Sequence, residues 1–305
     1  MGKIAFIFPG QGAQFPGMGR SLYENSPTAR AMLDHFESLR PGTLEACFSG
    51  KELDRTDNTQ PCLYAVELAA AAAVMDAGIY PDVASGFSLG ELAAAACAGI
   101  ISAEDGFMLA AERGRLMREA AEREATGMVA VLKLPSEQVE QLCGKFENVY
   151  PVNYNCPGQV TVAGKLSELE RFGQTAKEAG GRVVPLKVQG AFHSPYMQPA
   201  AERFAVALLR YKLQAPRIPL YSNVTGEPYT GDYYNLLVRQ IVSPVRWQKI
   251  IENMAAAGVD TFFELGPGNT LSGMVSRTLP NAKVLALGDP EGIRKAAEVL
   301  ASAKR

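Results

Sequence analysis

The sequence predicts an α/β protein with a parallel β-sheet and a smaller inserted domain. Residues 3–8 form a continuous apolar run, which is typical of a strand buried on both faces of a parallel sheet. Residues 83–91 combine a short apolar segment, a turn flanked by glycines and the start of an alanine-rich helix. Residues 128–188 alternate in the order β-α-β-β-α-β, which is the split unit of ferredoxin-like domains.

The split unit interrupts the larger fold. We expect a large domain of residues 1–124 and 191–305, and a ferredoxin-like small domain of residues 125–190 inserted into it. Clefts between domains are preferred places for small-molecule sites, so a ligand cleft is expected at this junction.

Hydrophobic periodicity and turn residues predict the remaining elements. In the first part of the large domain we expect helices at residues 27–39, 60–77, 92–98 and 102–124. The last of these begins at Ser102, with Asp105 three positions on as in a capping box. In the small domain we expect strands at residues 128–134, 149–154, 159–163 and 182–188, and helices at 136–145 and 167–179. After the chain re-enters the large domain, we expect helices at residues 196–210, 232–241, 246–257, from 270 and at 291–303, and strands at 218–223, 261–265 and 283–287.

The composition is that of a globular cytosolic protein. Of 305 residues, 47% are hydrophobic and 20% charged, which excludes a disordered chain. The net charge of −2, with both signs interspersed, predicts no nucleic-acid partner, and the apolar runs are too short to span a membrane. Five scattered cysteines with no Cys-x-x-Cys pair predict free thiols in a reducing compartment and no zinc site.

The turn Gly86-Phe87-Ser88-Leu89-Gly90 has the pattern of a nucleophile elbow, in which a serine stands between a strand and a helix. Glycines suit the flanking positions because such a turn leaves no room for a Cβ atom. The hydroxyl of Ser88 would then lie at a helix N-terminus, where backbone N–H groups favour a developing negative charge. The alternative is an ordinary turn in which the serine caps the helix.

A second loop follows the first strand. The run Pro9-Gly10-Gln11-Gly12-Ala13-Gln14 lies where open α/β sheets place their ligands. It lacks the lysine of a phosphate-binding loop, so nucleotide binding is not expected. We expect it to supply backbone N–H groups to an oxyanion, with a merely structural turn as the alternative.

A serine nucleophile needs a base, and this chain has only two histidines. His35 lies in an amphipathic helix with no glycine loop near it and is expected on the surface. His193 lies at the domain junction and is the candidate base, unless it only caps the helix that follows. The group that orients the imidazole stays open, because either an acid or a backbone carbonyl would serve.

Six motifs together resemble the malonyl-CoA:acyl carrier protein transacylase family over essentially the whole chain. They are Pro9-Gly10-Gln11-Gly12, Gly86-Phe87-Ser88-Leu89-Gly90-Glu91, Arg113-Gly114-Arg115, Asn153-Tyr154-Asn155-Cys156-Pro157-Gly158-Gln159, Ala191-Phe192-His193-Ser194 and Glu264-Leu265-Gly266-Pro267-Gly268. The resemblance implies an α/β-hydrolase-like core with a ferredoxin-like insertion, in agreement with the organisation predicted from the residues.

The resemblance also implies residue roles. Ser88 would attack the malonyl thioester while His193 takes and returns the proton. The backbone N–H groups of Gln11 and Leu89 would hold the oxyanion. The main-chain carbonyl of Gln240 would orient the histidine.

Two further residues would set specificity, and one position departs from the family. Arg113 would bind the free carboxylate of the malonyl group; from the residues alone, a solvated arginine on a helix face is the simpler interpretation. Phe192 would disfavour an α-methyl branch, with core packing as the alternative. Most family members have histidine where this chain has Phe87, which bears on how water is kept from the acyl-enzyme.

The function implied is ping-pong transfer of malonyl from malonyl-CoA to the phosphopantetheine thiol of acyl carrier protein, for fatty acid biosynthesis. No metal or other cofactor is implied, and we expect a cytoplasmic monomer with coenzyme A and acyl carrier protein as partners. The alternatives are a trans-acting polyketide-synthase acyltransferase, a serine hydrolase that clears acyl groups from carrier proteins, and a silent carrier-binding module.

Overall fold

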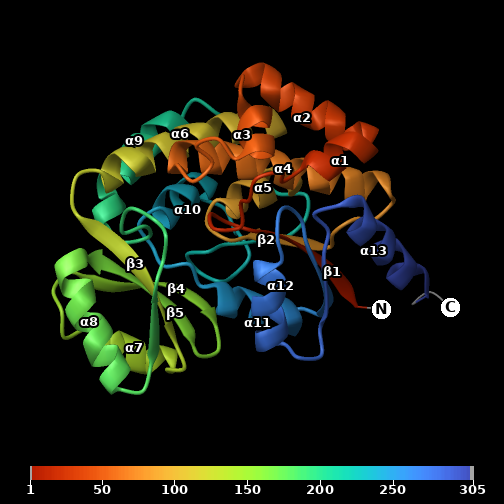
Figure 1. The fold of residues 1–305 in the computed structure, drawn as a ribbon. Helices are drawn as coiled ribbons and strands as arrows, with labels where there is room; N and C mark the ends of the chain where they lie inside the picture. The colour runs from red at the N-terminus through yellow and green to blue at the C-terminus, as the bar shows by residue number, and fades with distance from the viewer. Residues whose placement is uncertain (1, 303–305) are drawn as a thin grey trace.

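The computed structural model describes residues 2–302, which form two β-sheets surrounded by helices (Figure 1). The first sheet has five strands in the order β7-β2-β1-β8-β9, and all neighbouring pairs are parallel. Its strands are β1 (Lys3–Phe8), β2 (Val83–Gly86), β7 (Leu220–Tyr221), β8 (Val259–Glu264) and β9 (Lys283–Ala286). The predicted α/β class with a parallel sheet is confirmed.

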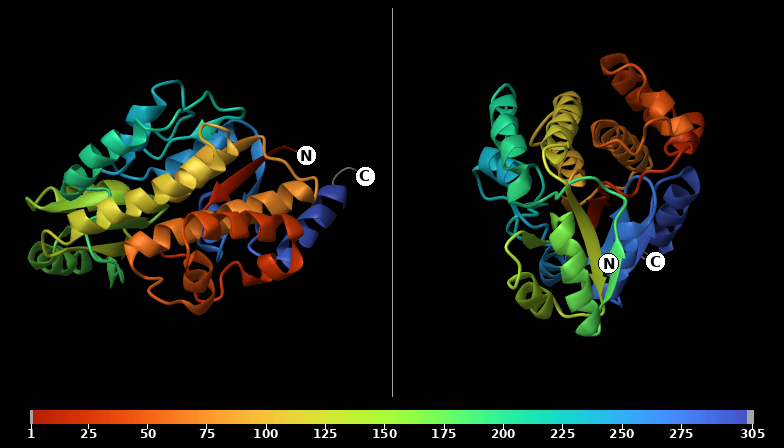
Figure 2. Two further views of the ribbon diagram at one scale, coloured as in Figure 1. Left: turned by 90° about the horizontal axis from the view of Figure 1, so that it is seen from above. Right: turned by 60° about the vertical axis from the view of Figure 1, so that its left-hand side comes forward.

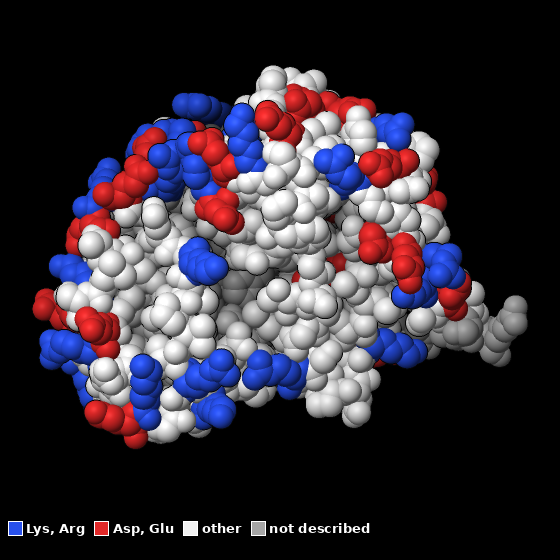
Figure 3. Space-filling view, viewed as in Figure 1, with Lys and Arg blue, Asp and Glu red and all other residues white. Residues whose placement is uncertain are grey.

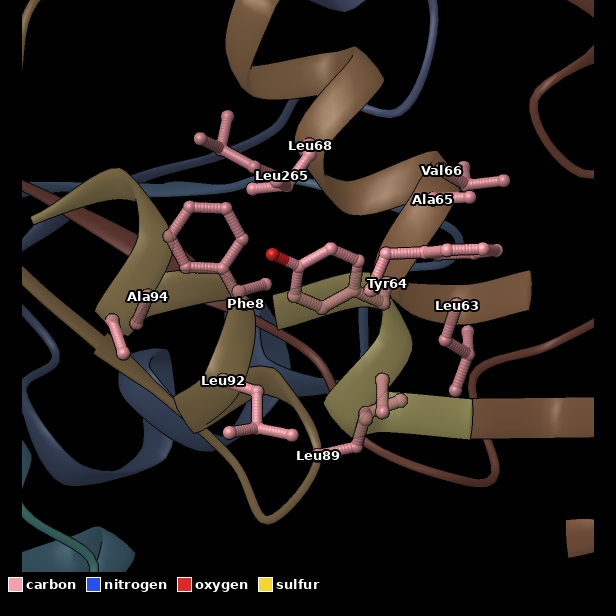
Figure 4. Packing of buried hydrophobic residues seen from close by; sticks show 14 of the residues in the cluster. Phe8, Leu63, Tyr64, Ala65, Val66, Leu68, Leu89, Leu92, Ala94 and Leu265 are labelled. Carbon is pink, nitrogen blue, oxygen red and sulfur yellow. The ribbon is translucent and has the colours of Figure 1, made fainter. Parts of the chain in front are cut away.

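Side chains alternate between the two faces of a strand, and in this sheet both faces carry apolar side chains. Helices therefore cover both faces. Phe6 and Phe8 of β1 join the larger core cluster, with α4 (Thr56–Asp76) and α5 (Gly90–Cys97). Ile7 belongs to a second cluster on the opposite face, with α11 (Trp247–Ala256) and α12 (Thr270–Thr278). Figure 4 shows the ring of Phe8 among buried side chains of α4 and α5. The sheet is therefore the middle of three layers.

The other helices of this part complete the outer layers. They are α1 (Arg20–Asn25), α2 (Pro27–Leu39), α3 (Thr43–Ser49), α6 (Ala103–Ala121), the 3-10 turn η1 (Pro195–Met197), α9 (Gln198–Leu208), α10 (Tyr233–Gln240) and α13 (Pro290–Ser302). The start of β1 and helix α13 lie at one end of the molecule, and the second sheet lies at the other (Figures 1 and 2).

The second sheet is antiparallel, with the strand order β4-β5-β3-β6. Its elements follow the predicted order: β3 (Thr126–Leu132), α7 (Ser136–Cys143), β4 (Val149–Cys156), β5 (Gln159–Lys165), α8 (Leu166–Glu178) and β6 (Arg182–Pro185). Val131 and Phe172 belong to a separate core cluster inside this unit. Met128 and Val152 join the larger cluster instead, so this sheet also packs against the rest of the molecule.

Several boundaries differ from the prediction. Helix α4 begins at Thr56, four residues early, and β6 ends at Pro185, three residues before the predicted end. Strand β7 has only two residues, and the predicted end of the last helix at 303 lies outside the described residues. Helices α1 and α3 were missed because left-handed glycines precede them, so neither has a capping side chain to mark its start.

The parallel sheet brings distant loops together. Phe8 at the end of β1 is in register with Gly86 at the end of β2, and Ile7 is in register with Glu264 of β8. The loops that follow these strands therefore meet at the carboxyl edge of the sheet, where open α/β sheets place ligands. Between residues 2 and 302, no helix has both the length and the apolar character needed to cross a membrane.

Candidate active site

Ser88 lies in a strained turn between β2 and α5. Its φ of 53° is in the left-handed region, which non-glycine residues rarely adopt. A Cβ atom on Gly86 would lie 1.9 Å from Gly90 C, and one on Gly90 would lie 2.2 Å from Phe8 O. Both flanking positions therefore require glycine. This is the geometry of the predicted elbow, with the serine held in a conformation that costs about 1–3 kcal/mol.

The elbow is clamped from a neighbouring strand. Asn223 follows β7, and its side-chain carbonyl accepts a bond from Ser88 N at 2.7 Å while its amide donates to Gly86 O at 2.7 Å. One side chain thus joins both sides of the strained turn. Sequence analysis missed this residue, although its place after a strand at the carboxyl edge of the sheet was a usable signal.

His193 lies beside the serine. Its Nε2 atom is 2.7 Å from Ser88 Oγ, and its Nδ1 atom is 2.8 Å from the main-chain carbonyl of Gln240. A carbonyl can only accept, so Nδ1 carries the proton and Nε2 is free to receive the serine proton. The structure therefore brings together the predicted nucleophile, base and orienting carbonyl.

The protonation state of His193 suits a base. The side chain is 3% exposed, and burial lowers the pKa of His193 to about 4. The positive charge of Arg113 also lowers this pKa, and the bond to Gln240 opposes the shift. The imidazole is neutral near neutral pH. His35, the other histidine, lies exposed on α2 and pairs with Glu104 at 3.5 Å, as predicted for a surface residue.

Arg113 is buried on α6 and is not on a solvated helix face, so the simpler interpretation of this residue was wrong. It is 2% exposed. Its guanidinium donates to Gln60 Oε1 at 2.7 Å, to Gln240 Oε1 at 2.7 Å and to Ser88 Oγ at 3.2 Å. Burial lowers the pKa of Arg113 to about 10, so the group stays charged at neutral pH. A fixed cation therefore stands directly beside the serine hydroxyl.

Gln11 and Leu89 line the same cavity as Ser88. Within residues 2–302, neither backbone N–H has a hydrogen-bond acceptor. The side chain of Gln11 is held by Thr56 Oγ1 at 3.2 Å. Both amides are therefore available to an oxygen atom placed near the serine.

The cavity above the serine has a volume of about 70 Å³. Its lining includes Phe87, Ser88, Arg113, Phe192 and His193, together with Met128 of β3 and Asn153 of β4. Phe87 also packs edge-on against Trp247, with ring centroids 5.6 Å apart. Both sheets thus contribute to the cavity, at the junction where a cleft was predicted.

The cavity has no obvious metal-binding group. No cluster of three or more His, Cys, Asp or Glu side chains that could hold a metal ion occurs within residues 2–302.

The parallel sheet, the strained serine and the neutral histidine are features of serine enzymes that transfer acyl groups to a thiol, an alcohol or water. Residues 5–297 match the family model described as "Acyl transferase domain". The malonyl CoA-acyl carrier protein transacylase of Bacillus subtilis is 38% identical, with 98% of each chain covered. A malonyl CoA-acyl carrier protein transacylase structure from Clostridium perfringens is 35% identical with a TM-score of 0.96, covering 99% of this chain and 98% of that one.

A solved complex of a malonyl-transacylase with its type II PKS acyl-carrier protein is also similar. It is 32% identical, with a TM-score of 0.94, over 97% of this chain and 99% of that chain. The chain belongs to the malonyl CoA-acyl carrier protein transacylase family.

Proposed function

We propose that this protein transfers a malonyl group from malonyl-CoA to the phosphopantetheine thiol of acyl carrier protein, for fatty acid biosynthesis. One observation carries the proposal: a buried, charged Arg113 lies 3.2 Å from the hydroxyl of a serine that is paired with a neutral histidine. A carboxylate on the acyl group would neutralise this cation at the point where the acyl group is attached.

In the first half-reaction, Ser88 Oγ attacks the thioester carbonyl and its proton moves to His193 Nε2. The tetrahedral oxyanion accepts bonds from the backbone N–H groups of Gln11 and Leu89. Collapse breaks the carbon–sulfur bond, and His193 returns the proton to the departing coenzyme A thiol. The carbonyl of Gln240 stabilises the imidazolium that forms in between.

In the second half-reaction, the carrier thiol attacks the malonyl ester of Ser88. His193 takes the thiol proton and returns it to the serine oxygen as the ester bond breaks. The thioester already provides an activated acyl group, so the proposed reaction uses no cofactor. Phe192 and Phe87 line the cavity, and we propose that Phe192 restricts an α-methyl branch.

A second cavity, of about 420 Å³, has a size that supports binding of a long substrate, and its charged lining residues are of both signs: Glu52, Asp54, Glu122, Arg55, Arg118 and Lys187. Gln11 of the first cavity bonds to Thr56 of the second, and Lys187 of the second lies between Leu186 and Val188 of the first. Within the described residues, Lys187 has no ion pair. Figure 3 shows Lys and Arg side chains along the lower edge of the hollow on this face, which suits phosphate groups and an acidic carrier.

The proposal includes a domain division and a cellular setting. We propose that residues 1–124 and 191–305 form an α/β-hydrolase-like domain and that residues 125–190 form a ferredoxin-like insertion, as the strand orders of the two sheets support. The five cysteines are free thiols, which supports a reducing, cytoplasmic location. We propose a monomer that meets coenzyme A and acyl carrier protein in turn.

Intact-mass analysis tests the function. The protein is mixed with malonyl-CoA, then with holo acyl carrier protein, and Ser88→Ala serves as the control. We expect a malonyl adduct on the wild type that moves to the carrier, and no adduct on the variant. An adduct that decays to malonate while the carrier stays unloaded would replace the transferase by a hydrolase. Parallel tests with fatty-acid and polyketide carriers identify the acceptor.

A further inference from the structure

Glu91 is a buried carboxylate three residues beyond the serine, in the first turn of α5, and the reaction described above does not use it. The side chain is 0% exposed. Its Oε1 atom accepts from Asn223 N at 3.0 Å and from Tyr229 OH at 2.8 Å. Its Oε2 atom accepts from Gln240 Nε2 at 2.8 Å. Three donors from distant parts of the chain thus converge on one charged group.

Two of these donors belong to residues that hold the site. Asn223 is the clamp on the elbow, and Glu91 fixes its backbone. Gln240 provides the carbonyl that accepts from His193, and its side chain joins Glu91 to Arg113. Glu91 is therefore one bond away from the residues that touch the serine, the histidine and the arginine.

The side-chain amide of Gln240 has a direction, because its oxygen accepts and its nitrogen donates. The oxygen faces Arg113 at 2.7 Å, and the nitrogen donates to Glu91 Oε2 and, at 2.6 Å, to Ser88 O. The ionised carboxylate of Glu91 and the carbonyl of Ser88 both accept, and Arg113 donates, so these three partners together set this direction. With the amide reversed, its nitrogen would face the guanidinium, and Arg113 would lose an acceptor.

The buried position of Glu91 disfavours its charged form. Burial raises the pKa of Glu91 to about 7, although Tyr229, Asn223 and Gln240 donate to it and Arg113 lies nearby. A buried ionised carboxylate is costly even when it is fully bonded, and a neutral side chain of the same shape would fill the space at lower cost. Its position beside Gln240 calls for a role in the site.

We infer that Glu91 is a positioning residue for malonyl transfer: its carboxylate fixes the direction of the Gln240 amide and the backbone of Asn223, and so holds Arg113 in the orientation that receives a substrate carboxylate. This inference rests on the proposed function. It predicts that loss of the Glu91 charge affects malonyl-CoA more than acetyl-CoA, because only the malonyl group uses Arg113.

The first test is Glu91→Gln, assayed for transfer from malonyl-CoA and from acetyl-CoA. An amide at position 91 has only one acceptor oxygen, so either the bond from Asn223 N or the bond from Gln240 Nε2 is lost, and the hold on one of these residues loosens. We expect the ratio of the two kcat/KM values to shift against malonyl by about 10- to 100-fold, equivalent to about 1.4–2.7 kcal/mol. A folded variant with the wild-type ratio would overturn the inference.

The second test combines Glu91→Gln with Arg113→Ala. If Glu91 acts on selectivity through Arg113, the double variant loses no more malonyl preference than Arg113→Ala alone, to within about threefold. Losses that multiply would show that Glu91 acts independently of Arg113 and would contradict the inference.

Glu67→Gln is the matched control. Glu67 is a second glutamate with 0% exposure, on α4, and within residues 2–302 its carboxylate has no hydrogen-bond partner. We expect this change to leave both kcat/KM values unaltered. If the control and Glu91→Gln lost the same malonyl preference, the positioning role inferred for Glu91 would be refuted.

If Glu91→Gln does not fold, the inference can be tested on the wild-type protein by hydrogen exchange and NMR. The Gln240 side-chain amide protons should resist hydrogen exchange and shift in NMR spectra when Ser88 becomes malonylated. Exchange as fast as in an exposed glutamine would refute the inference. Failure of the proposed function is distinguished from both results, because the wild type would then load no malonyl onto the carrier.

Discussion

Replacing Arg113 with alanine tests the electrostatic basis of malonyl selection. The guanidinium is 2% exposed and bonds to amide and hydroxyl oxygens, those of Gln60, Gln240 and Ser88. Among residues 2–302 no carboxylate forms an ion pair with it, so its charge is available to a substrate carboxylate. An acetyl group leaves this cation without an anionic partner.

The expected magnitude follows from the burial. Removing one partner of a buried ion pair costs about 3–5 kcal/mol. At about 1.36 kcal/mol for each tenfold change in rate, this corresponds to a loss of roughly 10²- to 10³-fold or more in kcat/KM for malonyl-CoA. Acetyl-CoA makes no such pair, so its kcat/KM should change by less than about tenfold, which is the cost of the repacked cavity.

The assay is loading of holo acyl carrier protein from each thioester over a range of concentrations, so that kcat/KM is obtained for both substrates. Arg115→Ala is the matched control, because Arg115 lies two residues further along α6, is 43% exposed and pairs with Glu112 and Glu119. Removing such surface ion pairs costs about 0–1 kcal/mol and should not affect selectivity. Equal losses for malonyl-CoA and acetyl-CoA in Arg113→Ala would refute the assignment of Arg113 to the carboxylate.

Three further predictions follow from the same geometry. Because the pKa of His193 is lowered to about 4, the rate of Ser88 acylation by acetyl-CoA, which does not use Arg113, should stay constant as pH falls from 8 to 6 and be halved only near pH 4; a half-loss near 6.5, measured by rapid-quench mass analysis, would contradict this. Gly90→Ala places a Cβ atom 2.2 Å from Phe8 O and should destabilise the protein by about 3 kcal/mol in urea unfolding, whereas Gly273→Ala, with no atom within 4 Å, should not. Phe192→Leu should raise use of methylmalonyl-CoA relative to malonyl-CoA by about tenfold, and an unchanged ratio would leave Phe192 as core packing.

Much of the fold was predictable because its signals are local. The continuous apolar run of β1, the Ser102 cap of α6 and the β-α-β-β-α-β order each lie within a short stretch of chain. Ser102 Oγ accepts from Asp105 N at 3.0 Å, as the capping pattern predicted. The missed helices α1 and α3 lack such a signal, because glycine provides no side chain to cap them.

The residues of the candidate site also fall into those that local sequence predicts and those that it does not. The elbow could be predicted from five consecutive residues, because a serine at φ 53° with no room for neighbouring Cβ atoms requires this pattern. His193 followed from the scarcity of histidine and the domain junction. The orienting carbonyl of Gln240 could not be predicted from the residues alone, because every residue has a backbone carbonyl. It was predicted only from the family resemblance.

The sequence by itself determined the fold class, the strained serine and its base, because these depend on backbone conformation, spacing and rare residue types. Only the tertiary structure decided that Arg113 is buried, that Asn223 clamps the elbow and that the Gln240 amide donates to Glu91. Asn223 and Gln240 lie 135 and 152 residues from Ser88 along the chain. Contacts over such separations depend on which strands are neighbours at the carboxyl edge of the sheet, and no local pattern records that choice.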